Sequence, residues 1–348
     1  MSAERLAALT LALTLLACGT PEREGAPQQR EGIEEAPPRA SPDRLDAHVH
    51  LVDDAGDELL AALDRQGIAA AVVVASPHLD PRSGVVLDDS GVLPGWRAAN
   101  DRILADTAAH RDRLLPFVTV EPAEVELDEL AAWFERGACG VKLYAGHQRL
   151  HARPLDDPAN DRLFDWLEAE RVPLLLHVNT VRFRDELAHL LREHPDLELV
   201  CAHLCGSRTD LDRLAGLLRE FPRLRVDTSH GAGVHGVEGF TAIEGERERL
   251  RAMILAEPER FVFGSDLVTV HSPLGPSATA REWDLQLAAN LGLIERDEFE
   301  FWRRPDTGPS GGLTVERYQG LALEGPVRDR VLAGNAREWL GSCGAGRP

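Results

Sequence analysis

A short apolar run near residue 45 ends in the sequence Asp46-Ala47-His48-Val49-His50. Side chains two residues apart on a β-strand point to the same side, so His48 and His50 would face one site together. Imidazole nitrogens are common ligands of zinc and similar divalent ions. The pair therefore predicts one half of a metal site.

Three later apolar runs also end in a side chain that can bind metal. They are Leu174–His177, Leu199–His203 and Phe261–Asp266. A bound divalent ion lowers the pKa of water to about 7 in favourable cases, so hydroxide becomes available to attack a carbonyl. Asp266 could bind the ion, accept the water proton and pass it to the leaving group. We expect His203 to point inward from the strand face of Cys201, and to polarise the substrate oxygen or bind a second ion.

Eight apolar runs rich in Val, Ile, Leu and Phe predict buried strands. They lie near residues 45–50, 69–75, 114–120, 139–144, 172–178, 198–204, 224–229 and 261–266. Segments with helical spacing lie between them, for example Leu211, Leu214 and Leu218. Eight alternating units over about 250 residues predict an α/β fold of the (β/α)8 TIM-barrel class, in which the strand ends share one face. An open doubly wound sheet is the alternative, but no Gly-x-Gly-x-x-Gly turn follows the first strand.

The ordered set of residues at the strand ends resembles the amidohydrolase superfamily. The set consists of His48, His50, Lys142, His177, His203 and Asp266. The phrases Gly140-Val141-Lys142-Leu143-Tyr144 and Gly264-Ser265-Asp266 are most similar to the amidohydrolase-related branch, or family 2, and the resemblance covers Leu45 to Leu340. It implies one or two divalent ions held by His48, His50, His177 and Asp266, with zinc first and manganese as the alternative. That branch also contains metal-dependent decarboxylases and lactonases.

Lys142 has three interpretations. In two-metal members of the superfamily, a lysine at this strand carries a carboxylate derived from CO2 and bridges the ions, with His203 as a further ligand. Otherwise Lys142 could contact substrate or form a structural ion pair. Tyr144 and His147 follow it toward the loop, and we expect both to contact substrate.

Three functions remain open at this point. The first is a hydrolase that uses a metal-activated water to cleave an amide, ester or lactone bond of a small molecule. The second is a metal-dependent, non-oxidative decarboxylase of a small carboxylic acid. The third is a non-catalytic binding protein anchored to a membrane. The complete ligand set favours an enzyme.

The first 42 residues predict export and anchoring. Leu6–Ala17 is an apolar stretch too short to span a bilayer but suited to a signal peptide, and Leu15-Leu16-Ala17-Cys18 resembles the lipobox of bacterial lipoproteins. The resemblance implies lipidation at Cys18 and a place on the periplasmic or cell-surface side of a bacterial membrane; another secretory signal is the alternative. Residues 19–42 predict a disordered tether, residues 43–341 the catalytic domain and residues 342–348 a tail.

Acidic residues outnumber basic ones by 58 to 38, which gives a formal net charge of −20. Such a chain repels phosphate backbones, so nucleic acid is excluded as a partner, and anionic lipids would be repelled in the same way. A small-molecule substrate is expected, and a homo-oligomer is left open. Cys139, Cys201 and Cys205 lie on or beside predicted strands, where we expect small buried thiols.

Overall fold

The computed structural model describes residues 44–147, 149–230, 233–303, 314–341 and 343. The predicted signal peptide, the tether and the lipidation site at Cys18 lie outside the described residues and stay predictions. Within the described part of the chain, no helix is both long enough and apolar enough to cross a bilayer.

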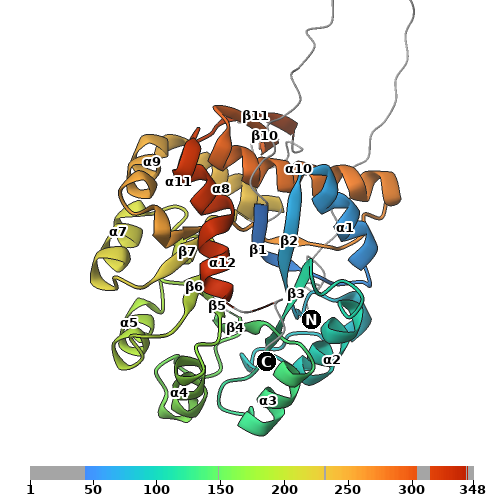
Figure 1. The fold of residues 1–348 in the computed structure, drawn as a ribbon, viewed down its shortest axis with the longest axis vertical. Coiled ribbons are helices and arrows are strands. Elements are labelled where there is room, and N and C mark those ends of the chain that lie inside the picture. Colours follow the sequence, from blue (N-terminus) through green and yellow to red (C-terminus); the bar gives the residue numbers. More distant parts are fainter. Residues whose placement is uncertain (1–43, 148, 231–232, 304–313, 342, 344–348) are drawn as a thin grey trace, which may run out of the picture. The chain divides into compact units, whose positions relative to one another are not determined.

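Parallel strands form the central sheet of the structure (Figure 1). Within the described residues they are β1 (Arg44–His50), β2 (Ile68–Val74), β3 (Leu114–Thr119), β4 (Gly140–Gly146), β5 (Leu174–Val178), β6 (Leu199–Cys201), β7 (Arg225–Asp227), β8 (Phe261–Val262) and β9 (Leu267–Val268). The spatial order is β8-β7-β6-β5-β4-β3-β2-β1-β9. Each predicted strand is present, and the eighth position is divided into β8 and β9.

One run of chain, residues 261–268, joins the two ends of the sheet. Its first part, β8, pairs with β7, and its last part, β9, pairs with β1. Between them, Ala47 N donates to Phe263 O over 2.9 Å, and Asp266 N donates to His48 O over 2.8 Å. The sheet therefore closes on itself, and the predicted TIM-barrel class is confirmed.

Helices alternate with the strands and surround them (Figure 1). They are α1 (Gly56–Arg65), α2 (Trp96–Asp106), α3 (Leu127–Glu135), α4 (Asp161–Ala169), α5 (Arg184–Glu193), α6 (Ala202–Gly206), α7 (Leu211–Glu220), α8 (Gly233–Gly245), α9 (Arg247–Ala256), α10 (Pro276–Glu295), α11 (Gly325–Asp329) and α12 (Asn335–Leu340). Short helical turns lie at η1 (Pro81–Ser83), η2 (Pro158–Asn160), η3 (Pro258–Arg260) and η4 (Arg330–Gly334). In α7, the predicted residues Leu211, Leu214 and Leu218 are buried, because residues three or four apart share one face of a helix.

The last helix covers the end of the barrel at which the strands begin. Trp339 of α12 packs with Leu45 and Leu115, which lie at the starts of β1 and β3, and its indole N–H donates to Glu198 O over 2.8 Å. The Trp339 and Phe117 rings lie 5.3 Å apart. The carboxyl ends of the strands, which carry the predicted ligands, are therefore at the opposite face.

The described cysteines are paired, so the expectation of free buried thiols was wrong. Cys139 bonds to Cys343, with Cα atoms 5.3 Å apart, and Cys201 bonds to Cys205, with Cα atoms 4.7 Å apart. Both separations lie in the range of disulfides. The first pair joins residues 204 positions apart in sequence, a proximity that only the fold creates.

The region after α10 contains a hairpin that the sequence pattern did not predict. Strands β10 (Glu298–Arg303) and β11 (Thr314–Gln319) pair antiparallel. Phe299, Phe301 and Tyr318 of this hairpin surround Phe240 of α8, with ring centroids 4.8–5.9 Å from it. The hairpin thus buries an aromatic cluster outside the barrel sheet.

Candidate metal centre

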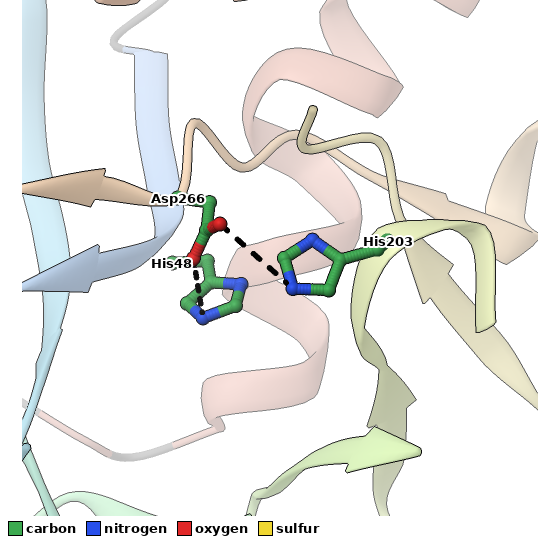
Figure 2. A group of neighbouring side chains, drawn as sticks. All are labelled: His48, His203 and Asp266. Carbon is green, nitrogen blue, oxygen red and sulfur yellow. Dashed lines mark ion pairs between the residues drawn. The ribbon is translucent and has the colours of Figure 1, made fainter. Parts of the chain in front are cut away.

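His48, His203 and Asp266 meet at the carboxyl ends of the strands (Figure 2). One ligand atom from each lies within 4.8 Å of the ligand atoms of the other two. His48 comes from β1, His203 follows β6 and Asp266 lies between β8 and β9. Residues more than 200 positions apart thus form one group that can hold a metal ion.

Asp266 is the centre of this group. Its Oδ1 lies 2.9 Å from His50 Nε2 and 3.3 Å from His48 Nε2, and its Oδ2 lies 3.8 Å from His203 Nε2. Burial acts to raise the pKa of Asp266, but positive charge placed among His203, His48 and His50 outweighs burial and holds this pKa well below its usual value. The side chain is therefore a carboxylate at neutral pH.

The tautomer of His48 is set by Asp227, which the sequence analysis missed. His48 Nδ1–H donates to Asp227 Oδ2 over 2.8 Å, and both side chains are fully buried. A carboxylate can only accept, so the proton stays on Nδ1 and the Nε2 lone pair faces Asp266. The available signal was an acidic residue within the apolar run of the seventh predicted strand, residues 224–229.

Asp227 also determines the tautomer of His203. Its Oδ1 accepts from His203 N over 2.7 Å, from Ser229 N over 3.0 Å and from the Ser229 hydroxyl over 2.6 Å. The Ser229 proton is therefore engaged, so Ser229 Oγ accepts from His203 Nδ1–H over 2.8 Å. His203 Nε2 is left as a second lone pair directed at Asp266.

His50 is oriented in a similar way by Ser76. The Ser76 hydroxyl donates to Val74 O, so it accepts from His50 Nδ1–H over 2.6 Å. The hydroxyl of Tyr144 lies 2.8 Å from Ser76 Oγ and 3.3 Å from His50 Nδ1. Burial lowers the pKa of His50 to about 4, which keeps the ring neutral at pH 7. Tyr144 thus lies behind His50; its predicted contact with substrate stays a prediction.

His177 and His147 extend the group along the rim. The His177 ring lies 4.9 Å from the rings of both His203 and His147. Burial holds the pKa of His177 well below its usual value, so its ring is neutral. The structure thus places all four predicted histidine ligands at one rim. The set whose ligand atoms all lie within 4.8 Å of one another consists of His48, His203 and Asp266.

Lys142 lies inside the group. Its side chain is fully buried, and its Nζ lies 3.1 Å from His48 Nε2. Burial lowers the pKa of Lys142 to about 8, so a fraction of the amine is neutral at pH 7. The neutral amine is the form that adds CO2, so this position is compatible with a bridging carboxylated lysine and with a lysine that contacts substrate.

Arg208, which no sequence pattern indicated, is a partly buried cation beside this group. Within the described residues, its guanidinium makes one hydrogen bond, from Nη1 to His230 O over 2.9 Å, and no ion pair with a carboxylate. Burial lowers the pKa of Arg208, opposed by the charges of Asp266 and Asp227, and its own charge helps to lower the pKa of His203. Buried charges are normally paired, so Arg208 offers a place for an anionic group.

The chain is similar in sequence to one protein family and similar in fold to several solved structures. The family model described as Amidohydrolase matches residues 45–342. No curated protein matches the chain. Several solved structures with a similar fold match the chain at low sequence identity.

Three of these structures match this chain over 98–99% of their own length. A TIM-barrel protein from Bordetella bronchiseptica is 12% identical, with a TM-score of 0.55 over 86% of this chain and 99% of that one. A Pseudomonas putida protein named as a 2-pyrone-4,6-dicarboxylic acid hydrolase is 18% identical, with a TM-score of 0.54 over 86% and 98%. An amidohydrolase from Burkholderia multivorans with bound zinc is 16% identical, with a TM-score of 0.52 over 87% and 99%. At these identities the likeness concerns the fold.

Proposed function

Because this chain belongs to the amidohydrolase family, we propose that it is a metal-dependent hydrolase that cleaves an amide, ester or lactone bond of a small molecule. The observation that carries this proposal is the position of the Asp266 carboxylate, within 3.8 Å of Nε2 atoms from three histidines. A carboxylate in this position can both bind a metal ion and receive a proton from water.

The nitrogen and oxygen atoms that face one another in this group suit a divalent cation. The tautomers set by Asp227 direct the lone pairs of His48 Nε2 and His203 Nε2 toward a carboxylate, so acceptors face one another. A cation among them satisfies all three, and the mixture of nitrogen and carboxylate oxygen suits zinc, with manganese as the alternative. His48, His203 and Asp266 would hold the ion, with His50 and His177 within reach of a first or second ion.

The bound ion would supply Lewis acidity, which lowers the pKa of the attacking water and polarises the substrate carbonyl. Asp266 stays ionised at pH 7 and is therefore ready to accept the water proton and to return it to the leaving group. Asp227 keeps the nitrogens of His48 and His203 available. Lys142 is positioned to contact the substrate or, once carboxylated, to bridge two ions.

We propose further that the substrate carries an anionic group such as a carboxylate. Arg208 supports this proposal, because its partly buried guanidinium forms no ion pair with a carboxylate among the described residues. Its charge helps to lower the pKa of His203, and the charge of Asp266 acts to raise the pKa of Arg208, so the guanidinium lies within electrostatic range of the metal group. A guanidinium recognises a planar anion through paired hydrogen bonds. Lys142, Tyr144 and His147 are the further candidates for contacts with the substrate.

Arg208→Gln should raise KM for an anionic substrate by about 10- to 100-fold, because a hydrogen bond to a charged group contributes about 1.5–3 kcal/mol. The change in kcat should be smaller. Steady-state kinetics on matched anionic and neutral esters would measure this effect. Arg184→Gln is the control, because Arg184 forms its ion pair with Glu220 outside the metal group. Equal losses on both esters would contradict an anion site at Arg208.

Metal removal tests the proposed function itself. The full-length protein, treated with a chelator, should lose hydrolysis of ester, lactone and amide test compounds and regain it with zinc or manganese. Elemental analysis should find about one ion per chain for a mononuclear centre, or about two if Lys142 bridges.

Two results would contradict the hydrolase. Absence of metal after reconstitution would favour a binding protein. Release of CO2 from small carboxylic acids without any hydrolytic product would identify the metal-dependent decarboxylase instead.

A further inference from the structure

A disulfide encloses the segment that carries His203. Cys201, the last residue of β6, bonds to Cys205, four positions later. His203 stands midway between the two sulfur-bearing residues and points from this turn toward Asp266 (Figure 2). Both cysteines are fully buried.

The backbone of this segment is left-handed, although a strand was predicted as far as residue 204. The φ angles of His203, Leu204 and Cys205 are 58°, 51° and 56°, and that of Gly206 is 64°. The element α6 is therefore a left-handed turn, a conformation that is unfavourable for each residue with a side chain. It directs the His203 ring inward from a position just beyond the strand.

The hydrogen bonds to this turn each fix the position of one backbone atom. Asp227 accepts from His203 N, and the Thr180 hydroxyl donates to Cys205 O over 2.6 Å. The disulfide is different, because it fixes the distance between the two ends of the segment. Three successive left-handed residues lie within or at the end of this covalent loop, and strained backbone persists where surrounding structure constrains it.

We propose that the Cys201–Cys205 disulfide positions His203, so that the metal centre is complete only when this disulfide is formed. This inference rests on the proposed function, in which His203 is a metal ligand. Without the covalent link, the turn can relax toward right-handed or extended backbone. His203 Nε2 then leaves Asp266, and the hydrogen bond from His203 Nδ1–H to Ser229 is lost.

A phosphine would reduce the Cys201–Cys205 disulfide to two thiols. The phosphorus attacks one sulfur and breaks the S–S bond; water then supplies the oxygen of the phosphine oxide and the two protons of the thiols. The disulfide is reduced and the phosphine is oxidised. Reoxidation with oxidised glutathione restores the bond through thiol–disulfide exchange and yields two reduced glutathione molecules.

The test compares two double variants of the full chain. Cys201→Ala with Cys205→Ala should weaken metal affinity and lower kcat by at least tenfold, with the circular dichroism of the fold retained. Cys139→Ala with Cys343→Ala removes the other described disulfide, which joins the residue before β4 to the end of the chain. It should keep metal affinity and kcat within about twofold, even if its Tm falls.

A proton NMR measurement separates this inference from the proposed function. The Nδ1–H protons of His48, His50 and His203 are all buried and hydrogen-bonded, so each should give a downfield resonance. The signal that is lost in His203→Gln belongs to His203, and the signal that is lost in His48→Gln belongs to His48. We expect the Cys201/Cys205 variant to lose the His203 signal and keep the His48 signal, while the Cys139/Cys343 variant keeps both.

The outcomes are distinct. Retention of the His203 signal and of metal affinity in the Cys201/Cys205 variant would overturn the inference. The expected NMR pattern in a protein that binds no metal would overturn the proposed function and leave the positioning role intact. Should the Cys201/Cys205 variant not fold, the Cys139/Cys343 variant treated with phosphine serves instead. Its metal affinity and activity should fall on reduction and return on reoxidation; no change in the fully reduced protein would contradict the inference.

Discussion

Asp266→Asn is expected to lower kcat by at least about 10³-fold while the protein stays folded. The amide keeps the volume of the side chain but cannot accept the water proton, and general acid–base catalysis alone contributes about 10²- to 10⁴-fold. It also removes the anionic ligand that lies closest to His50 and His48. Metal affinity should therefore fall together with turnover.

Steady-state kinetics, metal content and circular dichroism would measure these three quantities. Asp284→Asn is the matched control, because Asp284 lies on the outer helix α10, where it pairs with a partly exposed arginine, Arg65. It should leave kcat and metal content unchanged. Activity within tenfold of wild type in Asp266→Asn would show that Asp266 is not the proton acceptor.

Asp227→Asn is expected to weaken metal affinity by about 10- to 100-fold, although Asp227 is not one of the proposed ligands. Substitutions that disturb the orientation of metal ligands have effects of this size. Asp227 Oδ1 accepts from three donors, so the amide oxygen must take that place and the NH2 group must face His48 Nδ1. His48 then carries its proton on Nε2, which is the wrong tautomer for a ligand.

The same substitution has a pH-dependent effect on stability. Burial acts to raise the pKa of Asp227, but its hydrogen bond with His48 and nearby charges hold it below the ordinary value of 3.8. A carboxyl group whose pKa is lowered in the folded state stabilises the fold above its unfolded pKa, and this contribution is lost as the pH falls toward the folded pKa. Asp227→Asn should therefore cost about 1–3 kcal/mol at pH 7 and less below about pH 4.

Metal titration and chemical denaturation at several pH values would test Asp227→Asn. The control is Asp210→Asn, because Asp210 caps α7 by accepting from Arg213 N. That variant should have nearly normal stability, since asparagine caps helices as well as aspartate does, and its metal affinity should be unaffected. Unchanged metal affinity in Asp227→Asn would mean that the tautomer of His48 is not set by this carboxylate.

The sequence by itself determined the alternation of strands and helices and the rim at which the candidate ligands gather. Apolar periodicity is a local property, and the parallel arrangement of strands places every strand end on one face. His48, His50, His177 and Asp266 could therefore be assigned to one site before any distance was known. Their order along the chain was enough to indicate the family.

Only the tertiary structure decided how these groups are oriented. Asp227 contacts His48 across 179 positions of sequence, and Cys139 bonds to Cys343 across 204 positions. Arg208 is partly buried and forms no ion pair with a carboxylate among the described residues. A left-handed turn lies at His203, where a strand was predicted. The Cys201–Cys205 disulfide spans this turn, and its hydrogen bonds include those from His203 N to Asp227 and from the Thr180 hydroxyl to Cys205 O. Tautomers, buried charges and strained backbone depend on contacts between residues that lie far apart in the sequence. Local sequence patterns do not encode these contacts.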